Sequence, residues 1–185
     1  MINLIIAVTS DNGIGMADGS LPWKAPADMA RFKQLTTTKH VLMGRNTWET
    51  LPEKYRPLPW RHNIVLSRDP GYVVPGNVQL VSDLFGTLQM YKNNPHMDVF
   101  VMGGAQVYDE VMMAGIVDHV YITVMRSKED CQILQPNVFT KTPFANYHAL
   151  MGGMCAGTKY KLELEETDEP VGQPQMTFVN LARIS

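Results

Sequence analysis

The sequence predicts an α/β fold: one domain with a central, mixed but mostly parallel, twisted sheet, an antiparallel C-terminal edge and about four flanking helices. At 185 residues the chain has the length of one domain, because domains commonly hold about 150 residues. Strand-like and helix-like segments alternate with no linker, repeat or low-complexity tract between them, and the last third changes to consecutive strand-like segments. We therefore expect a single domain over residues 1–185.

Short apolar runs bounded by turn-forming residues predict the strands. They fall at residues 2–9, 40–43, 63–67, 78–81, 98–102, 118–125, 158–166 and 176–182. Segments with the length and composition of short helices lie between several of them, at residues 27–35, 46–51, 83–91 and 105–114. This order predicts helical crossovers, which join parallel strands in one sheet.

The C-terminal third predicts the antiparallel edge. Apolar and charged residues alternate over residues 160–165, which is typical of a half-buried strand, and no helix separates this strand from the next. Residues 163–169 hold five acids in seven positions, which we interpret as a solvated edge and turn in preference to a metal cage. No close cluster of Cys and His predicts a zinc site, so we expect no metal.

Composition argues against several classes of protein. Sixteen Lys and Arg against 18 Asp and Glu give a net charge of −2, which disfavours a general nucleic-acid binder. The apolar run at residues 2–8 is too short to span a bilayer and follows no Lys or Arg, so it predicts a buried strand and neither an anchor nor an export signal. The longest stretch without Asp, Glu, Lys or Arg, residues 142–158, contains Pro and Gly, which disfavour a membrane helix. We expect a cytoplasmic protein in which Cys131 and Cys155 are reduced thiols.

Positive charge is concentrated in one segment. Residues 39–68 hold six Lys and Arg but only two Glu, a local charge of +4 in a chain of −2. Such a field suits a small polyanion, such as a phosphorylated cofactor or a polycarboxylate. Ordinary surface bases are the alternative interpretation.

Two groups of glycines follow strand candidates. Gly13, Gly15 and Gly19 resemble a dinucleotide-binding turn, but prolines intervene before the next helix, whereas that motif needs a helix to begin at once. Residues 9–23 are therefore expected to form a long loop, either a mobile lid or a surface excursion. The pair at 103–104 lies between a strand and a helix start, where backbone N–H groups can face an anion.

Asp28 is the most informative carboxylate. It lies in the first turn of the helix expected after Pro26, on one face with Phe32 and Leu35. A carboxylate on an apolar face needs hydrogen bonds or has its pKa raised, and a ligand with paired N–H donors supplies those bonds. The alternative is a carboxylate that stabilises the helix dipole and pairs with Arg31.

Several ordered blocks across residues 1–126 closely resemble the dihydrofolate reductase family. These blocks are residues 13–15 (GIG), 21–28 (LPWKAPAD), 32–33 (FK), 43–49 (MGRNTWE), 58–63 (LPWRHN), 65–68 (VLSR), 101–108 (VMGGAQVY) and 121–123 (YIT). Beyond Met125 the likeness is architectural only.

The resemblance implies that NADPH reduces 7,8-dihydrofolate to 5,6,7,8-tetrahydrofolate by hydride transfer to pterin C6 with protonation of N5. This reaction supports one-carbon metabolism and the synthesis of thymidylate and purines. The expected partner is the small-molecule substrate dihydrofolate, with no nucleic acid and no membrane, and the expected state is a monomer. About residues 39–105 are expected to form a subdomain that binds the adenosine part of the cofactor.

The resemblance implies a catalytic group. Asp28 matches the carboxylate that accepts hydrogen bonds from the pterin 2-amino group and N3, and Thr123 matches the hydroxyl that bridges to it. No second carboxylic acid is matched near the pterin. The proton is therefore expected to arrive through water near Trp23 and Leu21, while Asp28 acts on the electrostatics of the ring.

The resemblance also implies the lining of a binding cleft. Arg61 matches the arginine that grips the substrate α-carboxylate in a two-pronged contact. The other expected substrate-binding residues are Ile5, Asp28, Phe32, Leu51, Leu58, Met102 and Thr123. The expected cofactor-binding residues are Ala7, Ile14, Gly15, Gly44, Arg45, Asn46, Thr47, Ser67, Arg68, Gly103, Gly104, Ala105, Gln106 and Tyr108, with Gly103 and Gly104 resembling a cis glycine pair of the family.

This sequence departs from the family pattern at several places. Gln106 stands where many relatives carry a base, Ala105 replaces a frequent third glycine, and Trp60 precedes the arginine where Gly is common. Residues 127–138 lack the Gly-Asp pair with which several relatives latch the 13–21 loop.

Two other functions stay open. The related reductase of riboflavin synthesis shares the fold and cofactor but acts on a ribosylamino pyrimidine, and Asp28 near Trp23 argues against it. A non-catalytic folate-binding or structural protein could retain the same pocket.

Overall fold

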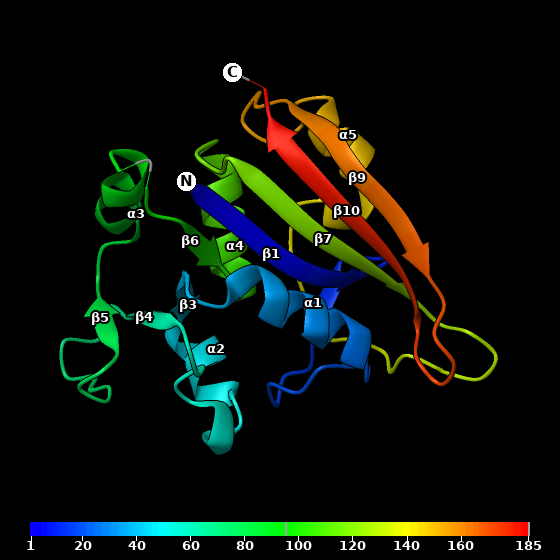
Figure 1. Ribbon diagram of the computed structural model, residues 1–185, viewed down its shortest axis with the longest axis horizontal. Coiled ribbons are helices and arrows are strands. Elements are labelled where there is room, and N and C mark those ends of the chain that lie inside the picture. The colour runs from blue at the N-terminus through cyan, green and yellow to red at the C-terminus, as the bar shows by residue number, and fades with distance from the viewer. Residues whose placement is uncertain (95, 185) are drawn as a thin grey trace.

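The computed structural model describes residues 1–94 and 96–184. Its centre is an eight-stranded sheet with the strand order β5-β4-β3-β6-β1-β7-β10-β9 (Figure 1). The strands of this sheet are β1 (Ile2–Thr9), β3 (His40–Gly44), β4 (His62–Leu66), β5 (Gln79–Val81), β6 (Val99–Val101), β7 (His119–Arg126), β9 (Tyr160–Asp168) and β10 (Gln175–Arg183). The α-helices are α1 (Pro26–Thr36), α2 (Arg45–Thr50), α3 (Leu84–Lys92), α4 (Ala105–Met113) and α5 (Tyr147–Met151).

The sheet is mixed, as the sequence predicts. β1 is parallel to β6 and β7, β3 is parallel to β4 and β6, and β4 is parallel to β5. β10 is antiparallel to both β7 and β9, so the direction changes only at the C-terminal edge of the described sheet. β9 is exposed along nearly its whole length, which agrees with a solvated acidic edge but not with the predicted half-buried strand, since both Leu162 and Leu164 are exposed.

Five short elements were not predicted. β2 (Gly13–Gly15) pairs with β8 (Val138–Phe139), and the 3₁₀ turn η2 (Phe144–Asn146) leads into α5; a further 3₁₀ turn is η1 (Glu53–Tyr55). The expectation that residues 9–23 are entirely loop is therefore wrong for β2. Its pairing involves a segment more than 120 positions away, and such short strands carry no periodicity of their own.

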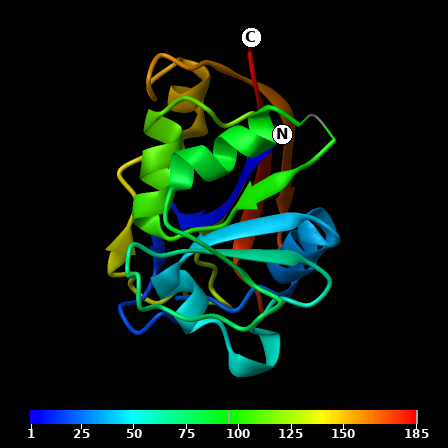
Figure 2. The same ribbon diagram turned by 90° about the vertical axis from the view of Figure 1, so that its left-hand side faces the viewer.

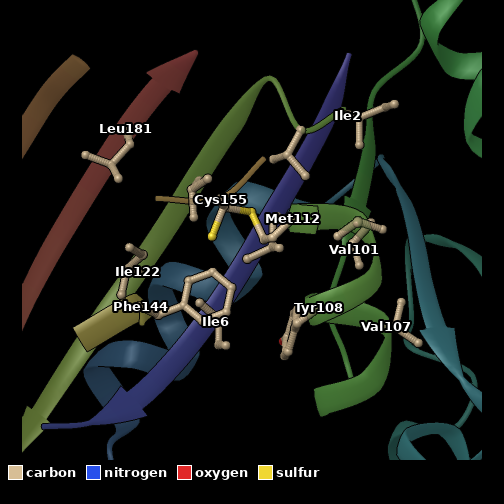
Figure 3. Close-up of a cluster of buried hydrophobic side chains, with 14 of the residues drawn as sticks. Ile2, Ile6, Val101, Val107, Tyr108, Met112, Ile122, Phe144, Cys155 and Leu181 are labelled. Atoms are coloured by element: carbon tan, nitrogen blue, oxygen red, sulfur yellow. The ribbon is translucent and has the colours of Figure 1, made fainter. Parts of the chain in front are cut away.

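Helices cover both faces of the sheet. β1 alternates its side chains between the faces: Ile6 joins a cluster that includes residues of α3, α4 and α5, whereas Ile5 joins a second cluster packed against α1 and α2. The view in Figure 2 shows the two groups of helices on opposite sides of the sheet. Figure 3 shows part of the first cluster, in which Ile6, Met112 and Phe144 pack around β1. Within the described ranges, no helix is long and apolar enough to cross a bilayer.

Candidate functional site

The cavity that contains nearly all the predicted site residues is a cleft of about 1540 Å³. It lies at the carboxyl ends of the neighbouring parallel strands β1, β3, β4 and β6, from which Ala7, Gly44, Leu66 and Met102 or their immediate neighbours reach its lining. Ligands of open α/β sheets commonly bind outside the carboxyl ends of parallel strands. α1, the N-terminal ends of α2 and α4, and the segment around residues 14–23 complete the walls.

Asp28 projects from the first turn of α1 into this cleft and is half-buried there. Burial raises the pKa of Asp28 above its ordinary value, and this effect outweighs hydrogen bonding from Thr123 and the charge of Arg31, which lower it. Thr123 is fully buried on β7 and lies outside the cleft lining. The alternative interpretation of Asp28, a direct ion pair with Arg31, does not form among the described residues: Arg31 donates from Nη2 to Asn180 Oδ1 at 2.5 Å and acts on Asp28 only through its charge.

Trp23 and Leu21 line the cleft beside Asp28. Trp23 is only 7% exposed, whereas Leu21 is 49% exposed. The Trp23 indole N–H is buried and donates to no acceptor among the described residues. Because a buried donor without a partner costs about 1–3 kcal/mol, this group is suited to hold a ligand or a water at the cleft.

Arg61 is held by three contacts. Its Nε donates to Thr36 Oγ1 at 3.0 Å, its Nη1 donates to the Pro59 carbonyl at 2.9 Å, and its guanidinium lies 5.5 Å from the centre of the Phe32 ring. Burial lowers the pKa of Arg61, but a guanidinium remains charged at neutral pH. A fixed guanidinium on the cleft wall is suited to a carboxylate or phosphate.

The apolar residues predicted to bind substrate come together on the wall between Asp28 and Arg61. The wall contains Ile5 from β1, Phe32 from α1 and Met102 after β6. Leu51 and Leu58, from the segment after α2, complete it. A mostly apolar wall with a few placed polar groups is typical of a small-molecule site.

The other end of the cleft is more exposed. Arg45 opens α2 and pairs with Asp69 at 3.1 Å and Glu49 at 3.9 Å, with its guanidinium 5.4 Å from the Tyr72 ring centre. Arg68 follows β4 and lines the same end. Asn46, Thr47 and Ser67 also line it.

The predicted positive segment is divided between two places. Arg45, Arg61 and Arg68 line the cleft, whereas Lys39 lies at the opposite end of β3 and donates to Asp98 at 2.7 Å. Lys39 comes directly before β3 and Arg45 directly after it, so the whole length of this five-residue strand separates their charges. The prediction of one positive field over residues 39–68 is therefore too broad.

The glycine pair lies between β6 and α4, as predicted, and its peptide bond is cis. The Gly44 N–H donates to the Gly103 carbonyl at 2.8 Å, and a Cβ on Gly104 would lie 3.1 Å from Thr47 Oγ1. α4 begins at Ala105 with no side-chain cap, whereas Asp83 caps α3. The first N–H groups of α4 are thus available to an anion at the glycine pair.

Three further residues of the predicted cofactor set lie on α4. Tyr108 donates to the Ile5 carbonyl at 2.8 Å, and burial strongly raises the pKa of its hydroxyl. Gln106 donates to Glu110 at 2.7 Å. Ala105 lines the cleft at the start of α4.

The segment around β2 closes over one side of the cleft, with Ala7, Ile14 and Gly15 in the lining. Backbone N–H groups of Asn137 and Leu134 donate to the carbonyls of Gly15 at 3.2 Å and Pro22 at 2.9 Å. These bonds attach the 13–22 segment to residues 134–139, although the latter lack the Gly-Asp pair of several relatives.

All predicted site residues line this cleft except Thr123. Thr36 and Asp69, which contact two of the three cleft arginines, were not predicted because neither belongs to a motif and each contact depends on the folded chain. Other lining residues outside the predicted set include Met16, Ala17, Gly19, Ser20, Met29, Lys33, Thr50, Tyr55, Phe85 and Glu110.

Fold and cleft together define an α/β protein with a partly apolar, arginine-lined cleft at the carboxyl ends of parallel strands. The family described as "Dihydrofolate reductase" matches residues 1–151, so the sequence likeness extends past Met125, where only an architectural likeness was expected. The chain therefore belongs to the dihydrofolate reductase family.

Individual relatives agree with this assignment. The chain is 36% identical over 148 residues to a dihydrofolate reductase of Schistosoma mansoni, covering 74% of this chain and 78% of that one. It is 42% identical over 110 residues to a dihydrofolate reductase of Mycobacterium leprae, covering 58% and 63%. A bifunctional dihydrofolate reductase-thymidylate synthase of Daucus carota is 36% identical over 146 residues, which cover 72% of this chain but 28% of that protein.

The fold also matches a solved structure. The dihydrofolate reductase of Enterococcus faecalis, complexed with NADP(H) and RAB-propyl, superposes with a TM-score of 0.79 at 22% identity, covering 100% of this chain and 97% of that one. This likeness supports the fold. The match to this protein covers less than a third of the length of the bifunctional relatives.

Proposed function

We propose that this protein reduces 7,8-dihydrofolate to 5,6,7,8-tetrahydrofolate with NADPH as hydride donor. The observation that carries the proposal is the placement of Asp28 and Arg61 along one apolar cleft wall. A carboxylate is complementary to the paired N–H donors of a pterin, and a guanidinium is complementary to the substrate's carboxylate. Family membership and the names of the relatives support the same reaction.

Asp28 orients the pterin ring in this proposal. It accepts hydrogen bonds from the 2-amino group and N3, while Thr123 supports the carboxylate from the sheet. Its negative charge near the ring also favours a positive charge that develops on protonation of N5. Ile5, Phe32 and Leu51 provide the apolar contacts for the ring and its attached group.

The residues at the other end of the cleft fit a phosphorylated nucleotide. The uncapped start of α4 and the uncrowded glycine pair suit a pyrophosphate, and Arg45 and Arg68 suit a 2′-phosphate, which favours NADPH over NADH. About residues 39–105 form the proposed adenosine-binding part of the domain. The chemistry that bound NADPH supplies is a hydride for pterin C6.

The protein's own contribution to protonation is made at Trp23 and Leu21. The Trp23 N–H is available to fix a water beside the pterin, and Leu21 covers the site from the 13–22 segment. A proton reaches N5 through such a water, because no second acid is expected beside the ring.

The test follows the loss of absorbance at 340 nm in the presence of NADPH and dihydrofolate. Asp28→Asn is expected to keep the fold and lower turnover at neutral pH by about a hundredfold, because it removes a charge that acts in the transition state. Asp168→Asn is the matched control, since Asp168 is exposed at the end of β9 and outside the cleft lining. Activity of Asp28→Asn within twofold of the parent contradicts the assigned role.

The same assay separates the two rival functions. Binding of dihydrofolate without NADPH oxidation supports a non-catalytic folate-binding protein. Oxidation with a ribosylamino pyrimidine but not with dihydrofolate supports the riboflavin-pathway reaction.

A further inference from the structure

Arg61 uses some of its N–H donors for contacts within the protein and leaves others toward the cleft. A guanidinium carries five N–H donors, one on Nε and two on each Nη. The Nε donor is used by Thr36 Oγ1 and one Nη1 donor by the Pro59 carbonyl. The donors that remain are one on Nη1 and both on Nη2, so the free edge of the fork is the one between the two Nη atoms.

Thr36 is the last residue of α1, and its relative exposure is zero. Its hydroxyl donates to the Phe32 carbonyl at 2.7 Å, one helical turn earlier, and therefore offers a lone pair to Arg61 Nε. The direction of both hydrogen bonds is thus fixed. Thr36 does not line the cleft, so it cannot contact a ligand there directly.

We propose that Thr36 is a positioning residue that selects substrates carrying a carboxylate, by holding Arg61 with its Nη1–Nη2 edge toward the cleft. The inference rests on the proposed function, because it assigns the guanidinium to the substrate's carboxylate. A two-pronged contact requires both Nη atoms to face the carboxylate at once. A guanidinium free to rotate about its long side chain loses rotamer entropy when it binds, whereas Thr36 has already fixed it.

Two neighbouring features support this arrangement. The Phe32 ring lies against the guanidinium plane, and its own carbonyl accepts the Thr36 hydroxyl, so one residue limits Arg61 from two sides. The C-terminal end of α1 also carries the negative end of the helix dipole, which favours a cation beside Thr36.

The experiment compares two substrates on one set of variants. Dihydrofolate carries the carboxylate, and 6-methyl-7,8-dihydropterin carries the reducible ring without it. Thr36→Val keeps the shape but removes the acceptor for Arg61 Nε. We expect it to raise KM for dihydrofolate about tenfold, the order of one lost hydrogen bond to a charged group, with kcat and the KM for the dihydropterin within about twofold of the parent.

Two variants serve as matched controls. Thr37→Val removes a hydroxyl that also donates one turn back, to the Lys33 carbonyl at 2.6 Å, but no contact joins Thr37 to Arg61; it is expected to behave as the parent. Thr36→Ser keeps the hydroxyl and is expected to restore the parent KM for dihydrofolate. In an Arg61→Leu background, Thr36→Val is expected to have no further effect on KM, because the side chain that it positions is absent.

The outcomes distinguish this inference from the proposed function. If the parent protein oxidises NADPH with neither substrate, the proposed function fails first. If the parent reduces both and Thr36→Val leaves KM for dihydrofolate unchanged, or raises KM for both substrates equally, the positioning role is overturned. Thermal melting accompanies each variant; should Thr36→Val not melt cooperatively, Thr36→Ala is measured with the same two substrates under the same criteria.

Discussion

The two ends of the cleft hold their charged groups in different ways. At the end that contains Asp28 and Arg61, the charges are half-buried and bonded to internal groups of the protein. At the end that contains Arg45, the charged side chains are 40–50% exposed and pair with one another at the surface. The first end is rigid before a ligand arrives, whereas the second must exchange an ion pair for a ligand.

This difference has energetic consequences. Partly buried charges are screened less by salt than exposed ones, so recognition by Arg61 is expected to depend less on ionic strength than recognition by Arg45. Exposed ion pairs contribute about 0–1 kcal/mol and are screened at physiological salt. The Arg45–Asp69 pair is therefore weak enough to open for a phosphate, but it still competes with that phosphate.

The largest effect is expected at the rigid end. Arg61→Leu removes a two-pronged charged contact and is expected to raise KM for dihydrofolate about a hundredfold, with little dependence on salt between 50 and 300 mM. Steady-state kinetics at several salt concentrations measure both quantities. Arg56→Leu removes another cation of the same segment, one that lies outside the cleft lining, and is the control. A strong salt dependence of the parent's KM for dihydrofolate would remove the contrast between the two ends.

A smaller effect of opposite sign is expected at the exposed end. Asp69→Asn keeps the acceptor for the Gly71 N–H but removes the charge that holds Arg45. KM for NADPH is expected to fall about threefold, the scale of a surface ion pair, while KM for NADH stays unchanged. Glu110→Gln, at the same end of the cleft but bonded to Gln106, is the control. Equal changes for NADPH and NADH refute a role toward the 2′-phosphate.

The smallest effect concerns stability. The folded-state pKa of Asp28 is raised, so the folded protein binds more protons than the unfolded chain between the unfolded pKa, near 4, and the higher folded pKa. The contribution of Asp28 to stability therefore falls as pH rises through this window. Asp28→Asn is expected to melt up to a few degrees above the parent at pH 7, and the gap is expected to narrow toward pH 4. Melting curves of both proteins across this pH range measure the effect; a gap that widens at low pH contradicts the sign.

The sequence predicts the elements that carry a pattern of their own. All eight strands of the large sheet and the four longer helix candidates fall within about two residues of their predicted bounds, because each carries a local pattern of composition and turn-forming boundaries. β2, β8 and α5 are shorter than the windows in which periodicity can be measured. Their existence depends on tertiary contacts, such as the pairing of Gly13 with Phe139.

The residues of the candidate site also differ in how far the sequence predicts them. Residue chemistry singles out Asp28, since a carboxylate on an apolar helix face is unusual in itself, but leaves the helix-dipole alternative open until the family resemblance is added. The remaining site residues follow from the family resemblance, and the cleft contains nearly all of them. The sequence does not predict Thr36 and Asp69. Their contacts with Arg61 and Arg45 join residues 25 and 24 positions apart, and these contacts form only when α1, β3 and β4 are packed.

The length of α1 also sets the distance between the two proposed ligand contacts. Asp28 stands in its first turn and Thr36 at its last residue, eight positions apart, so a rise of 1.5 Å per residue separates their Cα atoms by about 12 Å along the helix axis. A helix is stiff over that distance, and the spacing between the proposed ring contact and the proposed carboxylate contact is therefore set by the backbone. A molecule with the right groups at the wrong separation can engage one end of α1 but not both.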